Sequence, residues 1–468
     1  MVIKMERPHP LYLYYDIKKW LVLLLLPVFR SIFSHQDTVS VILSSLRDVL
    51  IAACLISYSV AKWRRARYAL KGGLTFEHGL IFRRFLRVTA QDAASVEIER
   101  SPLMWLAGGR RVRINTAGLR RRADATIFLS SKAALNMAGE RSPCNGRRVS
   151  SHIFPTLILS ASSSNAALGL LTLAPALRQA GQILGREVTS EVYGLFNRLI
   201  SLGLPPFLDA TAHILVLGWC FAFLRTFTRT AGFTTQRRGQ QLFLLSGLIT
   251  VRKNYIDCGC ITAMELRQTL FMRLFGLHTV TITAAGYGRE KGARPIIIPA
   301  ARPRELCSGL DTLLPEYPTC PATLHPPRRA LLGYVLPPLI LTLASLLPLY
   351  AGGVWHMLAV VCFLAGIWWL SIRLSGYSRA GFGVSDRAVT MRYSRGLALY
   401  EIHVPRELAD CVRIIQAPWQ RHSKTCTVEL RCFGEKRRRH RVRALPLGQA
   451  QILAQRLIQI SNRPYTNP

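Results

Sequence analysis

The chain has 468 residues, a length that suggests about three domains. Half of its residues are hydrophobic, and 61 Lys and Arg stand against 25 Asp and Glu, for a formal net charge of +36. A soluble nucleic-acid-binding protein this basic usually has a lower apolar content, whereas apolar runs flanked by Lys and Arg are typical of a protein at a bilayer. The composition therefore argues against a soluble nucleic-acid-binding protein and predicts an integral membrane protein.

Six apolar segments are candidate membrane spans, because a span needs about 20 mostly apolar residues. They are Trp20–Phe33, Val39–Ala61, Pro155–Leu177, Pro205–Phe227, Ala330–Tyr350 and Trp355–Ile372. They form three hairpins, and the loop 178–204 within the middle hairpin has the periodicity of an amphipathic helix. A long basic segment follows each hairpin. Because positively charged loops stay inside, these segments and both termini are predicted to be cytoplasmic.

Two of the candidate spans contain ionisable residues. Asp48 follows Arg47 in the second span, and Asp209 and His213 lie one helical turn apart in the fourth. Ionisable residues inside a span are functional candidates, so a transporter or channel using Asp48, Asp209 and His213 is the alternative function. Asp209 and His213 lie near the start of their span, where a solvated interfacial position is the simpler interpretation. The sequence also lacks a symmetric pair of broken helices.

The three basic segments contain a repeat that is marked by glycines. Residues from about 79 to 118 align without a gap on the stretch 168 residues later, and the third segment follows the second at offsets of 149 and then 148. The matched glycines are Gly79, Gly247 and Gly396 at the first point, Gly108 and Gly276 at the second, and Gly118, Gly286 and Gly434 at the third. Lys424 stands at the second point of the third unit, so the turn there is expected to differ.

Each unit is predicted to consist mostly of strands and to end in a helix. Val112, Ile114 and Thr116 alternate with a period of two, as do their counterparts from Val280 to Ala284. The candidate terminal helices are Ser130–Ala138, Pro303–Leu314 and Leu447–Ile460. Several antiparallel strands and one terminal helix describe a small barrel or sandwich that is plugged by the helix.

The second unit carries a longer run of signature residues. The run reads Ile256-Asp257-Cys258-Gly259-Cys260-Ile261, then Gln268, Arg273-Leu274-Phe275-Gly276-Leu277, Val280 and Ala284-Ala285-Gly286. It resembles the signature of YdbS- and YdbT-like bacterial PH domains, also called membrane-flanked domains. Asp257 and Cys260 depart from that signature, which has Pro and Arg at these places. The resemblance implies a pleckstrin-homology-like barrel after each hairpin, no catalysis, and a place in the bacterial inner membrane.

The predicted fold is an α+β membrane protein with six transmembrane helices in three hairpins, each followed by a PH-like β-barrel or sandwich capped by a C-terminal helix. The predicted parts are an N-terminal segment with the first hairpin (1–61), the first PH-like domain (62–152), the second hairpin (153–228), the second domain (229–325), the third hairpin (326–374) and the third domain (375–468).

The functional hypothesis is a non-enzymatic inner-membrane scaffold whose three cytoplasmic PH-like modules contact anionic lipid or a partner protein, in envelope maintenance or stress tolerance. A related membrane protein with a single PH-like domain is a second candidate partner. Each basic residue near an anionic surface contributes about 1 kcal/mol. The candidate contacts are Arg83, Arg84, Arg252, Lys253, Arg437, Arg438 and Arg439.

No catalytic, metal or cofactor site is predicted. The sequence has no G-x-S-x-G, P-loop or HExxH motif. Cys258 and Cys260 have no second ligand pair nearby, so we interpret them as two residues on the same face of a strand. The basic run Lys436–Arg443 could neutralise nucleic-acid phosphates. It has no interleaved aromatic residues, and a solvated strand edge is the simpler interpretation. The sequence does not predict the oligomeric state.

Overall fold

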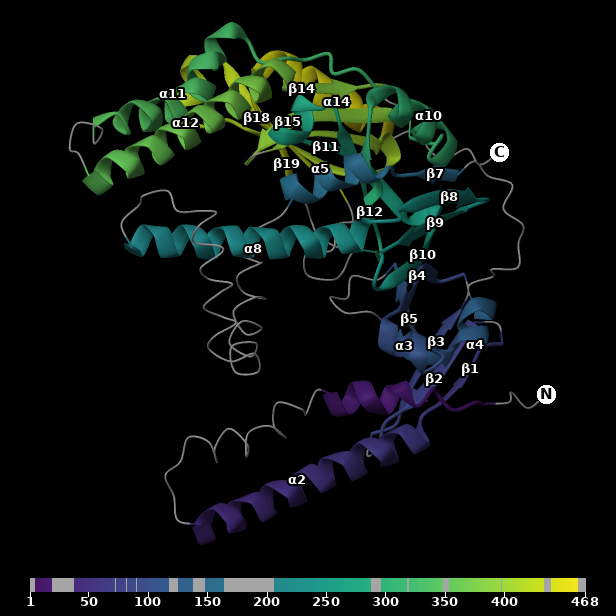
Figure 1. Ribbon diagram of the computed structural model, residues 1–468. Coiled ribbons are helices and arrows are strands. Elements are labelled where there is room, and N and C mark those ends of the chain that lie inside the picture. Colours follow the sequence, from purple (N-terminus) through teal and green to yellow (C-terminus); the bar gives the residue numbers. More distant parts are fainter. Residues whose placement is uncertain are drawn as a thin grey trace.

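The protein is a column of stacked antiparallel sheets from which long helices project to one side (Figure 1). The computed structural model describes residues 5–18, 38–71, 73–80, 82–89, 91–117, 125–137, 148–163, 206–287, 296–317, 320–347, 353–396, 398–432 and 439–461. In this part of the chain the strands form four sheets.

The strands follow one plan three times: three strands, three more strands, and a helix. The first unit contains β1 (Arg67–Ala69), β2 (Gly73–His78), β3 (Arg84–Thr89), β4 (Ala93–Arg100), β5 (Gly109–Thr116), β6 (Ala125–Ser130) and α4 (Ser131–Met137). The second contains β8 (Thr234–Arg238), β9 (Gln241–Ser246), β10 (Val251–Asp257), β11 (Ile261–Thr269), β12 (His278–Ala284), β13 (Ile296–Ala301) and α10 (Pro303–Leu313). The third contains β14 (Gly381–Val384), β15 (Ala388–Arg395), β16 (Ala398–Pro405), β17 (Ala409–Ile415), β18 (Thr425–Cys432), β19 (Arg439–Pro446) and α14 (Leu447–Ser461).

A short helix separates the fourth and fifth strands of each unit, and a few further elements lie outside the plan. The short helices are α3 (Pro102–Leu106), α9 (Leu270–Leu274) and α13 (Pro418–His422). The 3-10 turns are η1 (Cys258–Cys260), η2 (Arg328–Ala330) and η4 (Arg406–Leu408), and β7 (Arg148–Ser150) pairs with β8. The three terminal helices lie where the sequence predicts them.

The three units share one strand register. Val96 pairs with Ile114 in the first unit, Met264 with Ile282 in the second, and Val412 with Leu430 in the third. These pairs are related by offsets of 168 and 148, the offsets at which the sequence repeats. Alternating apolar residues fix a register because a slip of one residue would turn every buried side chain outward.

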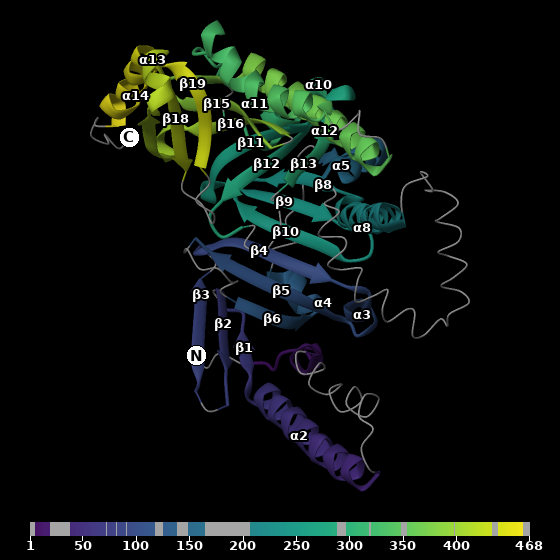
Figure 2. The same ribbon diagram turned by 90° about the vertical axis from the view of Figure 1, so that its left-hand side faces the viewer.

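Neighbouring units are joined by strand pairing. The fourth strand of one unit pairs with the third strand of the next, so that β4 pairs with β10 and β11 pairs with β16. Two continuous sheets result, with the strand orders β6-β5-β4-β10-β9-β8-β7 and β13-β12-β11-β16-β15-β14. Figure 2 shows β4 and β10 side by side at the first junction. The backbone therefore links the units as firmly as it links strands within each of them.

Each unit also has its own hydrophobic core, and side chains cross the first junction. The core of the first unit contains Ile98 and Val112, and Phe243 and Tyr255 of the second unit pack into it. The terminal helix closes the core: in α10, Leu306, Leu310 and Leu313 are buried at helical spacing. Fully burying a side chain of this size contributes roughly 1.5–3 kcal/mol.

The prediction of six transmembrane helices is wrong for the part of the chain that the structure describes. None of its helices combines the length and the apolar composition that a membrane crossing requires. The long helices are α2 (Thr38–Arg65), α8 (Pro206–Thr230) and α12 (Gly353–Arg379), and the shorter ones beside them are α5 (Ile153–Ser163) and α11 (Leu331–Ala344).

Helix length and charge explain much of this correction. A crossing needs about 20 residues, but α5 has 11 and α11 has 14. The α2 helix contains Arg47 and Asp48 and ends in three basic residues. The first candidate span, Trp20–Phe33, and the amphipathic loop 178–204 lie outside the described residues.

Two local predictions also need correction. Cys258 and Cys260 do not share a face of a strand, because they lie in the 3-10 turn η1, where Asp257 Oδ1 accepts a hydrogen bond from Gly259 N at 3.1 Å. Lys424 does not change its turn. It adopts the left-handed conformation, with φ 51°, that Gly108 and Gly276 adopt at the equivalent points.

Candidate functional site

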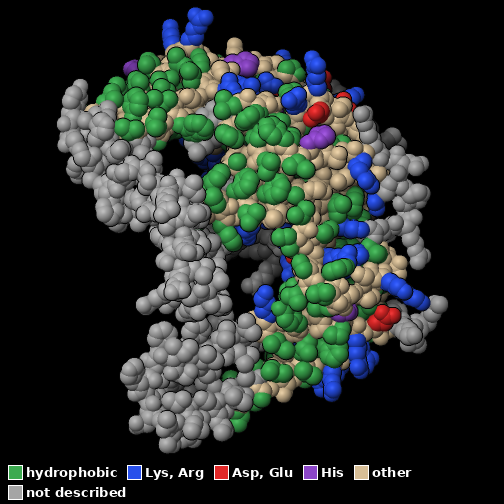
Figure 3. Space-filling model, viewed as in Figure 1, with side chains coloured by type: hydrophobic (Ala, Val, Ile, Leu, Met, Phe, Trp, Pro, Cys, Tyr) green, Lys and Arg blue, Asp and Glu red, His purple; other side chains and the backbone are tan. Residues whose placement is uncertain are grey.

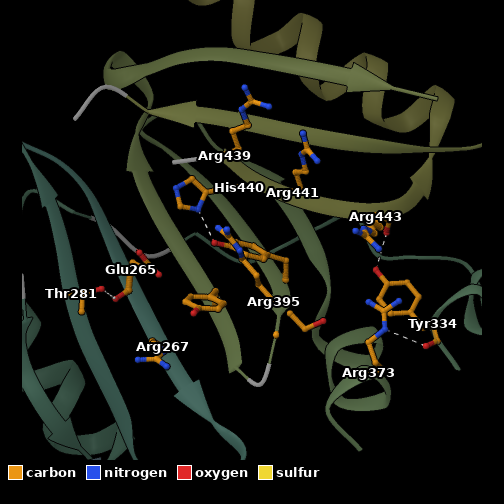
Figure 4. Close-up of a pocket in the computed structure, with 14 residues that line it drawn as sticks. Glu265, Arg267, Thr281, Tyr334, Arg373, Arg395, Arg439, His440, Arg441 and Arg443 are labelled. Carbon is orange, nitrogen blue, oxygen red and sulfur yellow. Dashed lines mark hydrogen bonds between the residues drawn. The ribbon is translucent and has the colours of Figure 1, made fainter. Parts of the chain in front are cut away.

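A cavity of about 910 Å³ lies between the second and third units. Its walls come from β11 and β12 of the second unit, from β15, β16 and β19 of the third, and from α11 and α12 (Figure 4). Its charged lining consists of Arg267, Arg373, Arg395, Arg439, Arg441 and Arg443, with Glu265 as the carboxylate. Six guanidinium groups facing one carboxylate give the cavity a strong excess of positive charge, which attracts anions.

The edge strand β19 provides three of these arginines. Side chains alternate along a strand, so Arg439, Arg441 and Arg443 share a face, while His440 and Val442 between them are buried. The Nδ1 atom of His440 lies 2.7 Å from the hydroxyl of Tyr393. His440 and Tyr393 line the cavity as the arginines do, so both faces of β19 contribute to its wall (Figure 4).

A buried carboxylate organises the arginines on β18 and β19. Glu429 Oε2 accepts a hydrogen bond from Arg441 Nε at 2.6 Å, and Oε1 accepts one from Arg431 Nε at 2.8 Å. Burial alone would raise the pKa of Glu429, but these two hydrogen bonds and the charges of their donors lower it overall. Glu429 is therefore ionised at neutral pH and fixes the position of Arg441.

Arg267 is the arginine of β11 that lines the cavity. In the register of the second junction it lies opposite Tyr400. Its Nε atom is buried and has no hydrogen-bond partner among the described residues. A buried donor left unsatisfied costs about 1–3 kcal/mol, and the guanidinium adds a positive charge to the cavity wall, where it attracts anions.

At the equivalent place of the first junction the charges are paired within the protein. Glu99, which lies 168 residues before Arg267, faces Arg252 across the ladder at 3.6 Å and also contacts Arg111 and Arg113. The second junction thus has an arginine where the first has the glutamate that neutralises its neighbours. This exchange converts a closed ion-pair network into a site that can accept an external anion.

Arg373, Arg443 and Tyr334 form the opposite end of the cavity (Figure 4). Tyr334 donates a hydrogen bond to the Arg443 carbonyl at 3.0 Å, and Arg373 Nε donates one to the Tyr334 carbonyl at 3.3 Å. Burial lowers the pKa of the Arg373 guanidinium, and the charge of Arg443 lowers it further. Like charges held this close favour a bound anion.

A second cavity of about 450 Å³ adjoins the first. Arg267, Arg395 and Tyr400 line both of them. The remainder of the second cavity is more apolar, with Trp219 of α8 and Trp368 of α12 in its wall. The pair of cavities therefore offers a cationic compartment and an apolar compartment to one amphiphilic ligand.

Of the five predicted basic contacts that the structure describes, one lines this site. Arg439 lines the cavity, Arg252 belongs to the ion-pair network at the first junction, and Arg83 and Arg84 lie at the start of β3. Lys253 lies on β10 beside Arg252, and Arg437 and Arg438 lie outside the described residues.

Sequence reasoning missed Arg267, Arg373, Arg395, Arg441 and Arg443 as site residues. The available signal was the basic run Lys436–Arg443, which contains three of the cavity's arginines but was interpreted as a solvated strand edge.

The residues of the alternative hypothesis lie on two of the long helices. Asp48 lies in α2, and Asp209 and His213 lie in the first turns of α8. The orientation of their side chains lies outside the described part of the structure. Gly118 and Gly434 also lie outside it, whereas Gly79, Gly247 and Gly396 each adopt a positive φ in the equivalent turn of their units.

Comparison with known proteins places these observations in a family. The family model described as bacterial PH domain matches residues 21–138 and 190–312, just over half of the chain. Over 138 residues the chain is 31% identical to the UPF0699 transmembrane protein YdbT of Bacillus subtilis (strain 168). That alignment covers 29% of this chain and 28% of the relative, so the chain spans less than a third of the relative's length in the match. No solved structure matches the chain.

Proposed function

Because the chain belongs to the bacterial PH domain family, we propose that it is a membrane-associated, non-enzymatic scaffold that holds an anionic lipid between its second and third PH-like units. Residues 62–152, 229–325 and 375–468 are taken as its three modules. The observation that carries the proposal is Arg267, which lines the cavity with five further arginines and whose buried Nε has no hydrogen-bond partner among the described residues.

Exposed apolar side chains support the association with a membrane. Large apolar side chains on α11 and α12 are widely exposed, among them Leu332 at 71%, Ile340 at 57% and Leu364 at 59%. Figure 3 shows hydrophobic side chains gathered over these two helices. Apolar patches this extensive are typical of surfaces that contact a membrane or another protein. YdbT, the relative reported above, is itself named a transmembrane protein.

The two adjoining cavities fit the two ends of a lipid. A phosphate headgroup in the larger cavity would accept charge-assisted hydrogen bonds from Arg267 and Arg395, each contributing roughly 1.5–3 kcal/mol. The start of an acyl chain would then lie beside Trp219 and Trp368. The basic units are proposed to face the cytoplasm, where anionic lipids concentrate. Envelope maintenance or stress tolerance is the proposed setting, and a related membrane protein with a single PH-like domain is the proposed partner.

Tryptophan fluorescence tests the lipid site directly. The full chain, purified in mild detergent, is titrated with phosphatidylglycerol that carries bromine atoms on its acyl chains, which quench nearby tryptophans. We expect saturable quenching that is reduced in Trp368→Phe. Phosphatidylcholine with the same acyl chains should quench only weakly, because it lacks a net negative charge.

A matched pair of double variants separates the cavity from general charge. The variant R267Q/R395Q should raise the half-saturating lipid concentration at least about 100-fold, because it removes two such hydrogen bonds of roughly 1.5–3 kcal/mol each. R304Q/R387Q removes the same charge at exposed residues outside the cavity and should change it less than threefold. Equal effects of both variants would refute a cavity site. If inorganic phosphate displaced the lipid at low millimolar concentration, the ligand would be free phosphate.

A further inference from the structure

Two kinds of strand edge pair with each other inside the three-unit column, and one edge of each kind lies at an end of the column. At each internal junction the fourth strand of one unit pairs with the third strand of the next, antiparallel and over six residue pairs. Val96 lies opposite Tyr255 at the first junction, and Met264 lies opposite His403 at the second. The members of these pairs are related by the repeat offsets of 168 and 148, so both junctions use one register.

The same geometry leaves one strand of each kind without a neighbour. In the described part of the chain, β3 is the edge of the sheet β1-β2-β3, and β17 is the edge of the sheet β17-β18-β19. By their place in the unit, β3 is the counterpart of β10 and β16, and β17 is the counterpart of β4 and β11. Figure 2 shows β3 at the outer side of its sheet. Each chain therefore ends in two complementary edges.

We propose that β17 of one copy pairs with β3 of a second copy, so that the protein assembles head to tail through a third junction of the same kind. The occupant is another copy of this chain because the required edge is present at its own opposite end. Applying the shared register places Val412 opposite Arg87 and Ile414 opposite Phe85.

The side chains on the two edges suit this pairing. Phe85 is 66% exposed at the β3 edge, although it is a large apolar residue on a strand. An aromatic residue opposite a β-branched one, as Phe85 would lie opposite Ile414, stabilises an antiparallel pair by roughly 0.2–1 kcal/mol. Arg84 and Arg87 would face Ile415 and Val412, so no arginine lies directly opposite another.

Head-to-tail contacts predict a specific kind of assembly. A contact between two different surfaces does not close on itself after two copies, and it produces a ring or an open filament. An exposed edge strand without a partner is a liability for aggregation, and this pairing would cover it. We therefore expect chain-like oligomers whose length increases with protein concentration.

Sedimentation of the full chain in mild detergent tests the assembly. Wild type should show an average mass that rises with concentration, whereas Phe85→Asp should remain at the mass of one chain. Leu248→Asp is the matched control, because Leu248 is 65% exposed in the β9–β10 turn, away from both edges. A wild type that stays at the mass of one chain at all concentrations would overturn the proposal. So would equal dissociation by both variants.

Mixing experiments distinguish the head-to-tail contact from a symmetric one. Phe85→Asp retains its β17 edge, so small amounts added to wild type should cap and shorten the assemblies. The background lacks Cys144 and the cysteines that are exposed in the described residues, Cys54, Cys220, Cys307 and Cys411. In it, copies with F85C and copies with I414C should form a disulfide only when mixed. Equal cross-linking within the F85C sample alone would show that β3 pairs with β3 and would refute the proposal.

Discussion

Replacing Glu429 with Gln should loosen the third unit locally and by a predictable amount. The carboxylate side chain is 1% exposed, and it accepts hydrogen bonds from Arg431 and Arg441, whose side chains are 33% and 46% exposed. A glutamine keeps one acceptor oxygen but presents an NH₂ group to the other guanidinium. Removing a partner of a charged hydrogen bond costs about 1.5–3 kcal/mol, and solvation of the freed arginine by water keeps the expected loss near 2 kcal/mol.

Hydrogen exchange measured by mass spectrometry can locate this loss of stability in the third unit, because local opening of one unit need not unfold the others. A loss of about 2 kcal/mol corresponds to about 30-fold faster exchange in peptides from β18 and β19 of E429Q. E305Q, at an exposed residue of α10, is the control and should leave these peptides unchanged. Unchanged protection of β18 in E429Q would refute the role that we assign to the buried carboxylate, as would an equal loss in β12.

The same variant predicts a pH dependence. The pKa of Glu429 is lower in the folded protein than in the unfolded chain. Its contribution to stability is therefore fully present above the unfolded value of about 4.3 and is lost as the pH falls through the folded value. Wild type and E429Q should differ most near neutral pH and converge in acid. A difference that grew on acidification would contradict this sign.

Two further substitutions test the turns and the core. Lys424→Gly should stabilise the third unit by up to about 1 kcal/mol. A left-handed conformation costs a residue with a side chain roughly 1–2 kcal/mol, and the greater freedom of glycine in the unfolded chain offsets part of this gain. Hydrogen exchange of β18 should therefore become slower, and faster exchange would contradict the prediction. Tyr317→Phe should destabilise the second unit by about 1–2 kcal/mol, because the buried hydroxyl donates a 2.6 Å hydrogen bond to the Ile261 carbonyl. Hydrogen exchange of β11 should become faster in this variant, and unchanged exchange would refute the prediction.

The repeated strand pattern was predictable from the sequence because apolar and polar residues alternate locally along each strand. Matching apolar positions at fixed offsets imply matching registers, and the pairs Met264–Ile282 and Val412–Leu430 follow that rule. The turn at Lys424 was not predictable from the residue type, because a lysine there suggested a different turn from the one that glycine forms in the other two units. The turn is nevertheless kept, with a backbone hydrogen bond from the Lys424 N–H to the Arg421 carbonyl. Hydrogen bonding by neighbouring residues outweighed the intrinsic conformational preference.

The arginine cavity was not predictable because its residues meet only after two units pair. Arg267 and Arg395 come from different units, and no local pattern states that β11 lies beside β16. The predicted spans failed for a different reason. An apolar run indicates which residues avoid water, but it does not fix where a helix begins and ends, and α11 stops at Ala344.

The backbone ladders between units have a consequence for how such a protein can change in evolution. A junction made by main-chain hydrogen bonds needs little side-chain matching, so duplicating or deleting one whole unit would leave a workable joint on either side. A chain built this way can gain or lose modules in single genetic steps. Its individual cavities can then diverge, as the exchange of Glu99 for Arg267 between two equivalent positions illustrates.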